Sequence, residues 1–182
     1  MSRDKDLIDL APPQDAGIKS LLKVDAQALP LGTKPKKVGK NRRKSREIVV
    51  KAVYRSMLNA SDLKLVLRDM ADDPDYNKAD EAYFKQLLAL VMDNMVALDE
   101  KITQFVDRQM SELRPIEHAI LSVSGAELIY DMSIPYRVAI NEGVELAKIY
   151  GGTDGHKYIN GVLDKLAMDV RALEINAHKT SA

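Results

Sequence analysis

Apolar residues recur every three or four positions along almost the whole chain from Asn41 onward, and this spacing restricts the fold more than any other feature. The first such segment has its apolar residues at Ile48, Val49, Ala52, Val53 and Met57. This pattern is typical of an α-helix with one apolar face. It predicts helices near residues 42–58, 63–70, 84–95, 98–110, 115–128, 135–150 and 155–173. No segment alternates like a β-strand, so we predict an all-α fold of about seven helices with short connections.

Prolines and glycines mark several of the predicted helix ends. Pro115 and Pro135 suit the first position of a helix, where the missing N–H of proline would have no partner. Gly151 and Gly152 supply a stop for the helix before them. The acidic, proline-containing segment 71–80 is interpreted as a loop. Capping residues are expected before two other helices, namely Ser61 or Asp62 for one and Thr153 or Asp154 for the last.

Residues 1–40 differ in composition from the rest of the chain. They contain prolines and glycines at Pro12, Pro13, Gly17, Pro30, Gly32, Pro35 and Gly39. Such a density of helix-breaking residues disfavours a packed element, so this segment is predicted to be a flexible tail.

Several classes of protein are excluded by what the sequence lacks. Charges interrupt every apolar stretch before it reaches the roughly 18 to 20 residues that a membrane-spanning helix needs. The N-terminus has no apolar run of the kind found in secretory signals. Without cysteine the chain has no disulfide, no thiolate nucleophile and no cysteine-bound metal. We therefore expect a soluble cytoplasmic protein that does not contact a membrane.

The charge of the chain sums to zero, with 27 basic and 27 acidic side chains, but it is unevenly distributed. Residues 1–33 carry −1, residues 34–58 carry +9 and the remaining residues carry −8. Eight positive charges and no acid fall between Lys34 and Arg46. A solvated linker is the simplest interpretation of such a run. An arm for RNA or DNA phosphates is favoured by one fact, which is that the run continues into a predicted helix.

No arrangement of residues typical of catalysis is apparent. The chain lacks a phosphate-binding glycine loop, a zinc-binding HExxH pair and a nucleophile elbow. Two close pairs, Asp154 with His156 and Glu142 with Glu145, suit a metal or acid–base site, but helix capping and a surface pair of Glu145 with Lys148 explain them better. We therefore expect no enzyme activity, no cofactor and no metal.

Two tyrosines stand beside basic residues. Tyr54 lies on the basic helix, and Tyr158 follows Lys157 near the start of the last helix. An exposed ring at either position is suited to stacking on an unpaired base. A half-buried tyrosine with its hydroxyl in water explains both equally well.

Three stretches resemble the NusB family of bacterial transcription antitermination factors. They are NRRKSREIVVKAVYRSML (41–58), LRPIEHAILSVSGAELIYDMSIPY (113–136) and IPYRVAINEGVELAKIYGGTDGHKYINGVLDKLA (134–167), and the HKYINGVLDK run is the most specific. The resemblance covers roughly residues 41–176. Two glycines depart from it, since Gly155 replaces a usual serine and Gly143 a usual alanine. Inside a helix the second change costs up to about 1 kcal/mol, unless close helix packing compensates.

The resemblance implies a helical RNA-binding domain (41–176) of two packed helical subdomains. The tail predicted from composition (1–40) has no counterpart in the family, and residues 177–182 are expected to be a C-terminal tail. The resemblance implies a non-enzymatic protein that binds the single-stranded boxA element of ribosomal RNA leader transcripts. The implied protein partner is NusE, a small-subunit ribosomal protein, and the pair helps RNA polymerase to read through terminators. The alternative is a protein-interaction module whose basic arm binds an acidic partner.

The resemblance also assigns residues to two surfaces. RNA-contacting positions are Arg42, Arg43, Lys44 and Arg46 on the first helix and Asp154, Lys157 and Tyr158 on the last, to which Tyr54 is added from its position on the basic helix. NusE-facing positions are Phe105, Arg108 and Glu117. A carboxylate repels phosphate, so Asp154 is expected either to accept a hydrogen bond from a base or simply to cap its helix.

Overall fold

The computed structural model describes residues 41–59 and 63–180 of the chain. The tail expected over residues 1–40 and the cap expected at Ser61 or Asp62 lie outside the described residues. Within the part that is described, no helix combines the length and the apolar character needed to cross a membrane.

The described residues form α-helices and two short 3-10 helices, and they contain no β-strand. The α-helices are α2 (Arg42–Asn59), α3 (Leu63–Ala71), α4 (Glu81–Asp93), α5 (Met95–Thr103), α6 (Pro115–Tyr130), α7 (Tyr136–Tyr150), α8 (Gly155–Val170) and α9 (Ala172–Thr180). The 3-10 helices are η1 (Tyr76–Lys78) and η2 (Met110–Glu112). The predicted all-α class is confirmed, with eight α-helices over residues 41–59 and 63–180 where about seven were expected for the chain.

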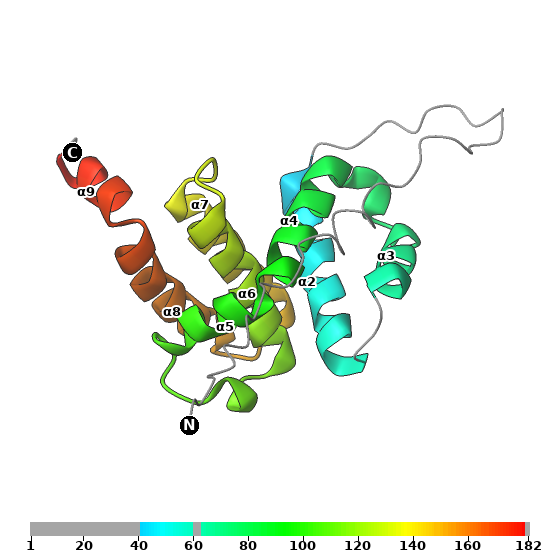
Figure 1. The fold of residues 1–182 in the computed structure, drawn as a ribbon, viewed down its shortest axis with the longest axis horizontal. Coiled ribbons are helices and arrows are strands. Elements are labelled where there is room, and N and C mark those ends of the chain that lie inside the picture. The colour runs from blue at the N-terminus through cyan, green and yellow to red at the C-terminus, as the bar shows by residue number, and fades with distance from the viewer. Residues whose placement is uncertain (1–40, 60–62, 181–182) are drawn as a thin grey trace, which may run out of the picture.

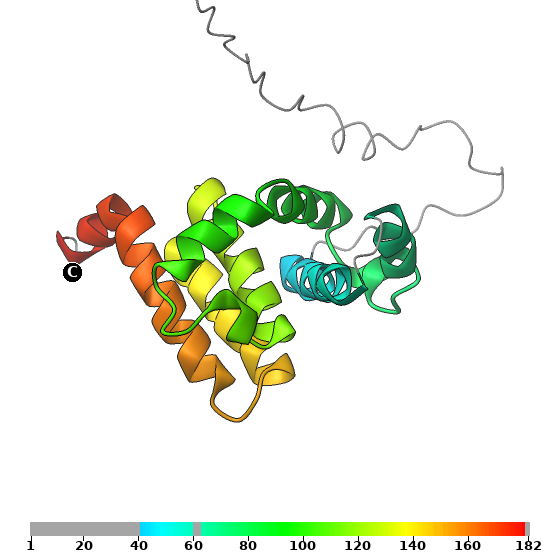
Figure 2. The same cartoon turned by 60° about the horizontal axis from the view of Figure 1, so that its bottom comes forward.

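The helices form two packed groups that meet at α6. Figure 1 shows α2, α3 and α4 at one end of the molecule and α7, α8 and α9 at the other, and the turned view in Figure 2 keeps this separation. Helix α6 packs against α2 and α4 on one side and against α5, α7 and α8 on the other. Because it is enclosed in this way, α6 is buried almost all round, from Ala119 to Leu128. The predicted pair of packed helical subdomains is therefore confirmed.

The apolar face predicted for the first helix is buried as expected. Ile48, Val49, Ala52 and Val53 of α2 have no exposed surface. They join a single core cluster to which every α-helix from α2 to α8 contributes. Burying an aliphatic side chain of this size contributes about 1.5 to 3 kcal/mol, so this face anchors the basic helix firmly against the rest of the protein.

One predicted helix is too long. The helix expected over residues 98–110 ends at Thr103, and Phe105 follows it in a loop, while Met110 begins η2. In the last turn the Thr103 hydroxyl donates to the carbonyl of Asp99 at 2.7 Å. Side chains that bond to the backbone in this way compete with helix continuation. The apolar spacing persists beyond Thr103 because Phe105 still packs against the core, although from a loop.

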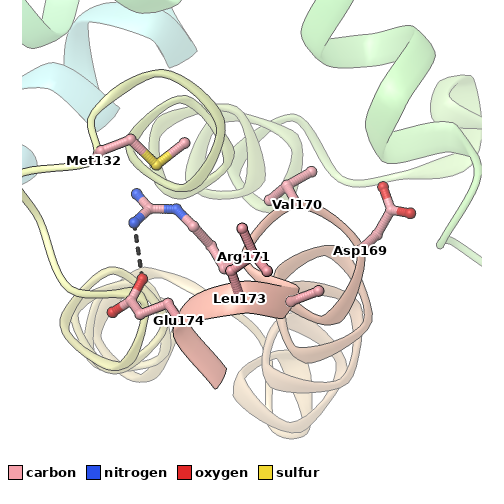
Figure 3. A pocket seen from close by; sticks show the side chains of 7 residues that line it. Met132, Asp169, Val170, Arg171, Leu173 and Glu174 are labelled. Atoms are coloured by element: carbon pink, nitrogen blue, oxygen red, sulfur yellow. Dashed lines mark hydrogen bonds and ion pairs between the residues drawn. The ribbon is translucent and has the colours of Figure 1, made fainter. Parts of the chain in front are cut away.

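The last predicted helix is divided at Arg171, which ends α8 and precedes α9. The Arg171 guanidinium donates to the carbonyl oxygens of Leu128 at 2.6 Å, Glu127 at 3.0 Å and Asp131 at 2.8 Å, at the end of α6. Figure 3 shows this side chain with its ion pair to Glu174. Arg171 therefore supplies a partner for the Leu128 carbonyl and a second donor for the other two carbonyls, which already accept a backbone N–H. Helix α9 continues through the domain boundary expected at residue 176.

The predicted helix ends at proline and glycine are largely confirmed. Pro115 is the first residue of α6, and α7 ends at Tyr150 with Gly151 as its cap. Helix α7 begins one residue later than predicted, because Pro135 is its N-cap residue and not its first residue.

Gly143 allows three helices to pack closely. A Cβ atom at this position of α7 would overlap the Ser124 hydroxyl of α6 and would lie 2.9 Å from Leu163 Cδ1 of α8. Close helix packing thus compensates for the poor helix propensity of glycine at this position.

Replacing Gly143 by alanine is expected to lower the free energy of unfolding by about 1 to 3 kcal/mol, because overpacking outweighs the better helix propensity of alanine. Urea denaturation at neutral pH measures this change. Gly161→Ala on α8 is the matched control, since a Cβ at residue 161 meets no atom within 4 Å and the substitution should stabilise the protein. A Gly143→Ala variant as stable as Gly161→Ala would contradict the packing argument.

Candidate nucleic-acid interface

The basic residues at the start of α2 differ in how freely they can meet a ligand. Asn41 directly precedes the helix, and its side chain accepts a hydrogen bond from the backbone N–H of Lys44 at 3.1 Å. Arg42 is exposed, with its guanidinium 4.7 Å from the centre of the Tyr83 ring. The Arg43 side chain is 52% exposed and lies 3.3 Å from a carboxylate oxygen of Glu145. No acidic residue occupies the first turn, so the positive end of the helix dipole adds to these arginines.

Lys44 is bound more tightly than its neighbours. Its ammonium group donates to Asp75 and to Glu47, each at 2.9 Å. These hydrogen bonds, that to Asp75 first, raise the pKa of Lys44 above its ordinary value. A phosphate would have to compete with two carboxylates for this lysine.

Arg46 has a structural role and does not fit the RNA contact expected for it. Its side chain is 5% exposed, and its Nε atom lies 2.8 Å from Oε1 of Glu127, which has no exposed surface. The Tyr83 hydroxyl donates to the same carboxylate oxygen, and Glu142 approaches Arg46 Nη1 at 3.9 Å. Burial raises the pKa of Glu127 to about 7, although the charge of Arg46 opposes this shift.

Tyr54 lines a mostly apolar hollow of about 360 Å³ between α2, α6 and α7. Lys51, Arg55, Ile116 and Tyr150 complete its lining. The Tyr150 hydroxyl donates to Glu47 at 2.6 Å, and burial and this bond raise the pKa of Tyr150. Lys51 and Arg55 were not identified from the sequence, although their spacing from Glu47 places all three on one face of a helix.

A second, polar hollow of about 320 Å³ lies at the N-terminus of α8. It is lined by Arg108, Arg114, Glu117, Thr153, Asp154, Gly155 and Tyr158. Two residues expected to face a protein partner, Arg108 and Glu117, therefore share one site with two expected to face RNA. The Arg108 guanidinium lies 4.6 Å from the centre of the Tyr158 ring, so the two sets are in direct contact.

Asp154 occupies the cap position predicted for it, but its side chain does not cap the helix. It is the N-cap residue of α8 and accepts no capping hydrogen bond through its side chain. Its carboxylate pairs instead with Lys157 at 2.9 Å, and both side chains are more than 70% exposed. An exposed pair of this kind contributes little to stability, so either charge is free to meet a ligand.

Two glycines keep this polar hollow open. A Cβ atom at residue 155 would lie 3.2 Å from Oε1 of Glu117, and the Arg114 guanidinium occupies the space that a side chain at Gly152 would take. Glu117 itself is only 7% exposed. The family that this chain resembles usually has serine at this position. Because Gly155 has no side chain, more space remains beside the Glu117 carboxylate.

Phe105 and Lys157 contribute to a third hollow, of about 240 Å³, on the neighbouring face of α8. Its lining also includes Asp107, Tyr158, Gly161, Val162 and Lys165. A hydrogen bond from Arg108 lowers the pKa of Asp107, so this acid is already paired with a cation. Tyr158 thus lies between the second and third hollows.

The remaining polar groups give no indication of a metal site. Residues 41–59 and 63–177 contain no group of three potential metal ligands. The expected surface pair of Glu145 with Lys148 is confirmed at 2.6 Å. A further hollow, of about 570 Å³ at the junction of α8 and α9, contains none of the predicted site residues (Figure 3).

Comparison with known proteins identifies the relatives of this chain. The NusB family model matches residues 43–168. The transcription antitermination protein NusB of Methylobacillus flagellatus is 58% identical over 135 residues, which are 74% of this chain and 88% of the relative. The protein of the same name from Thiobacillus denitrificans is 48% identical over 139 residues, covering 76% of this chain and 96% of the relative.

Solved structures agree with the fold. T. maritima NusB superposes with a TM-score of 0.63 at 25% identity, covering 71% of this chain and 92% of that chain. A crystal structure of the antitermination factors NusB and NusE in complex with double-stranded RNA contains a chain that superposes with a TM-score of 0.61. This second chain is 22% identical, and the match covers 70% of the present chain and 96% of the other. At this level of identity the similarity concerns the fold alone.

Proposed function

Because the chain belongs to the NusB family, we propose that it is a transcription antitermination factor that binds the boxA element of ribosomal RNA leader transcripts together with NusE. In this role it promotes read-through by RNA polymerase within an antitermination complex. It acts in the cytoplasm without enzymatic activity and without a cofactor. Residues 41–176 carry this function, and residues 1–40 and 177–182 flank them as tails.

The observation that carries the proposal is the exposed pair Arg42 and Arg43 at the positive end of α2. Two arginines at a helix N-terminus form a site for phosphate, because the side chains and the helix dipole attract the same anion. The hollow at Tyr54 lies further along α2 and combines two cations with two aromatic rings. This combination suits single-stranded RNA, whose backbone follows positive charge while its bases stack on aromatic side chains.

Base selectivity is assigned to the polar hollow at the start of α8. Phosphate contacts supply affinity without sequence choice, whereas base edges are read by groups of matching hydrogen-bonding character. Asp154 accepts hydrogen bonds only, so it fits an amino or imino group of a base. Tyr158 offers a ring on which an unpaired base can stack.

The ribosomal partner is assigned to Arg108 and Glu117 in the same hollow and to Phe105 in the neighbouring third hollow. Arg108 contacts the Tyr158 ring, so a partner that engages Arg108 also alters the surroundings of an RNA-stacking residue. This contact gives partner and RNA a direct means of affecting the affinity of each other. The acidic remainder of the chain, at −8, complements a basic ribosomal protein.

Fluorescence anisotropy with a boxA-type RNA and a scrambled RNA of equal length tests the proposal. We expect tighter binding of the boxA-type RNA, and a further gain when the small-subunit ribosomal partner is present. Equal affinity for both RNAs, with or without the partner, would contradict the proposed function. Binding to an acidic protein in place of either RNA would support the alternative, a protein-interaction module.

Stacking on Tyr158 makes a separate prediction. Tyr158→Leu removes the ring and is expected to weaken RNA binding about tenfold, the effect of losing one base–aromatic stack. Tyr158→Phe keeps the ring and should bind RNA within about twofold of wild type. Tyr130→Leu, at the partly exposed end of α6, is the matched control and should change nothing. Equal losses for the Leu and Phe variants would argue against stacking.

A further inference from the structure

Helix α8 contains a glycine that the fold itself does not require. Gly125 and Gly143 lie inside other helices, and a Cβ atom at either position would press against a neighbouring side chain. At Gly161 a Cβ atom would meet nothing within 4 Å. Glycine is among the poorest helix formers, yet residue 161 lies near the middle of α8. The packing of the described residues therefore gives no reason for a glycine at this exposed position.

The surroundings of Gly161 are positively charged. Lys157 lies one turn before it and Lys165 one turn after it, and four-residue spacing puts all three on one face, about 6 Å apart along the axis. All three line the hollow of about 240 Å³ that also contains Phe105 and Tyr158. Lys165 is exposed and forms no ion pair among the described residues, and Lys157 pairs only with the exposed Asp154. Asp107, the acid in this hollow, is neutralised by Arg108 at 2.9 Å.

We propose that Gly161 is a docking position for the sugar–phosphate backbone of the RNA, with Lys157 and Lys165 holding phosphates on either side of it. The missing side chain lets the strand approach the helix surface closely, and the lysines attract it. This inference rests on the proposed function and extends the RNA-binding surface beyond Tyr158 along α8. A basic ribosomal protein is a poorer occupant, because Lys165, which has no ion pair among the described residues, and the exposed Lys157 would repel it.

RNA-binding titrations of the full chain test this site. Gly161→Leu places a bulky side chain on the path and should weaken binding of the boxA-type RNA about fivefold, the effect of losing one typical hydrogen bond. Gly161→Ala should raise the melting temperature while also weakening RNA binding, a combination that misfolding cannot produce. Lys165→Ala should reduce the slope of log affinity against log salt by about 0.7, the value for one phosphate on a single strand.

Matched variants serve as controls. Asn160→Leu places the same apolar side chain at the adjacent exposed position, which does not line the hollow, and Lys85→Ala removes a partly exposed lysine from α4. Both should bind RNA like wild type. The inference is overturned if Gly161→Leu binds RNA with wild-type affinity. It is also overturned if this variant loses binding of the ribosomal partner but keeps its affinity for RNA. If the wild-type protein does not bind RNA, both the proposed function and this inference are wrong. If substitutions at Arg42 and Arg43 weaken RNA binding but substitutions at residue 161 do not, only this inference is wrong.

Discussion

Arg46→Ala is expected to lower the free energy of unfolding by roughly 3 to 5 kcal/mol at pH 8, the usual effect of breaking a buried ion pair. The substitution leaves the Glu127 carboxylate without its charged partner in a site that excludes water. Arg46 also lies over the Tyr83 ring at 5.3 Å, so packing is lost together with the charge. Arg42→Ala, one turn earlier and exposed, is the matched control and should cost less than about 0.5 kcal/mol.

The loss at Arg46 should depend on pH. Burial raises the pKa of Glu127 from its ordinary 4.5 to about 7, so the folded state holds this proton more tightly than the unfolded state does. Stability from this group is present below about pH 4.5 and is lost as the pH rises through about 7. Without Arg46 the pKa rises further, so the deficit of the variant grows above pH 7. Denaturation at pH 6 and pH 8 measures this, and an equal deficit at both would argue against it.

Replacing both Arg42 and Arg43 by alanine should leave the fold intact and remove two phosphate contacts. RNA affinity is expected to fall about thirtyfold, at about 1 kcal/mol for each contact. The slope of log affinity against log salt should decrease by about 1.4, because each phosphate on a single strand contributes about 0.7. Titrations of the boxA-type RNA at several salt concentrations give both values.

A control with the same change in net charge separates local contact from general attraction. Arg68→Ala with Lys85→Ala removes two exposed cations from α3 and α4, away from the proposed RNA surface. This variant should keep the wild-type slope and affinity. If the arginine variant also keeps the wild-type slope, Arg42 and Arg43 do not hold phosphates.

The sequence predicted the helical class because apolar spacing is local information. The stripe at Ile48, Val49 and Val53 places one face of α2 in the core without reference to any other helix. The same spacing indicates that Arg46 is buried, because it precedes Val49 by three residues and Val53 by seven and so lies on the buried face of the helix. A run of like charges conceals this difference, because charge alone does not distinguish the faces of a helix.

The candidate site was harder to predict because it depends on distant contacts. Arg108 and Tyr158 are fifty positions apart in sequence, and no local pattern indicates that one covers the ring of the other. Asp is a preferred N-cap residue, which is why Asp154 was expected to cap α8, but its side chain accepts no hydrogen bond from the first turn of this helix. Gly143 shows the same limit, since its need for space depends on Ser124 and Leu163 from two other helices.

The contact of Arg171 with the end of α6 has a consequence for how the protein is made. The carbonyl of Leu128, at the end of the most enclosed helix, obtains its donor from a residue about forty positions later. The carbonyls of Glu127 and Asp131 already accept a backbone N–H and obtain a second donor from the same residue. On the ribosome, a nascent chain has no such donor until residue 171 has left the exit tunnel. The end of the central helix therefore reaches its final hydrogen bonding only after a segment that follows it by about forty residues has been synthesised.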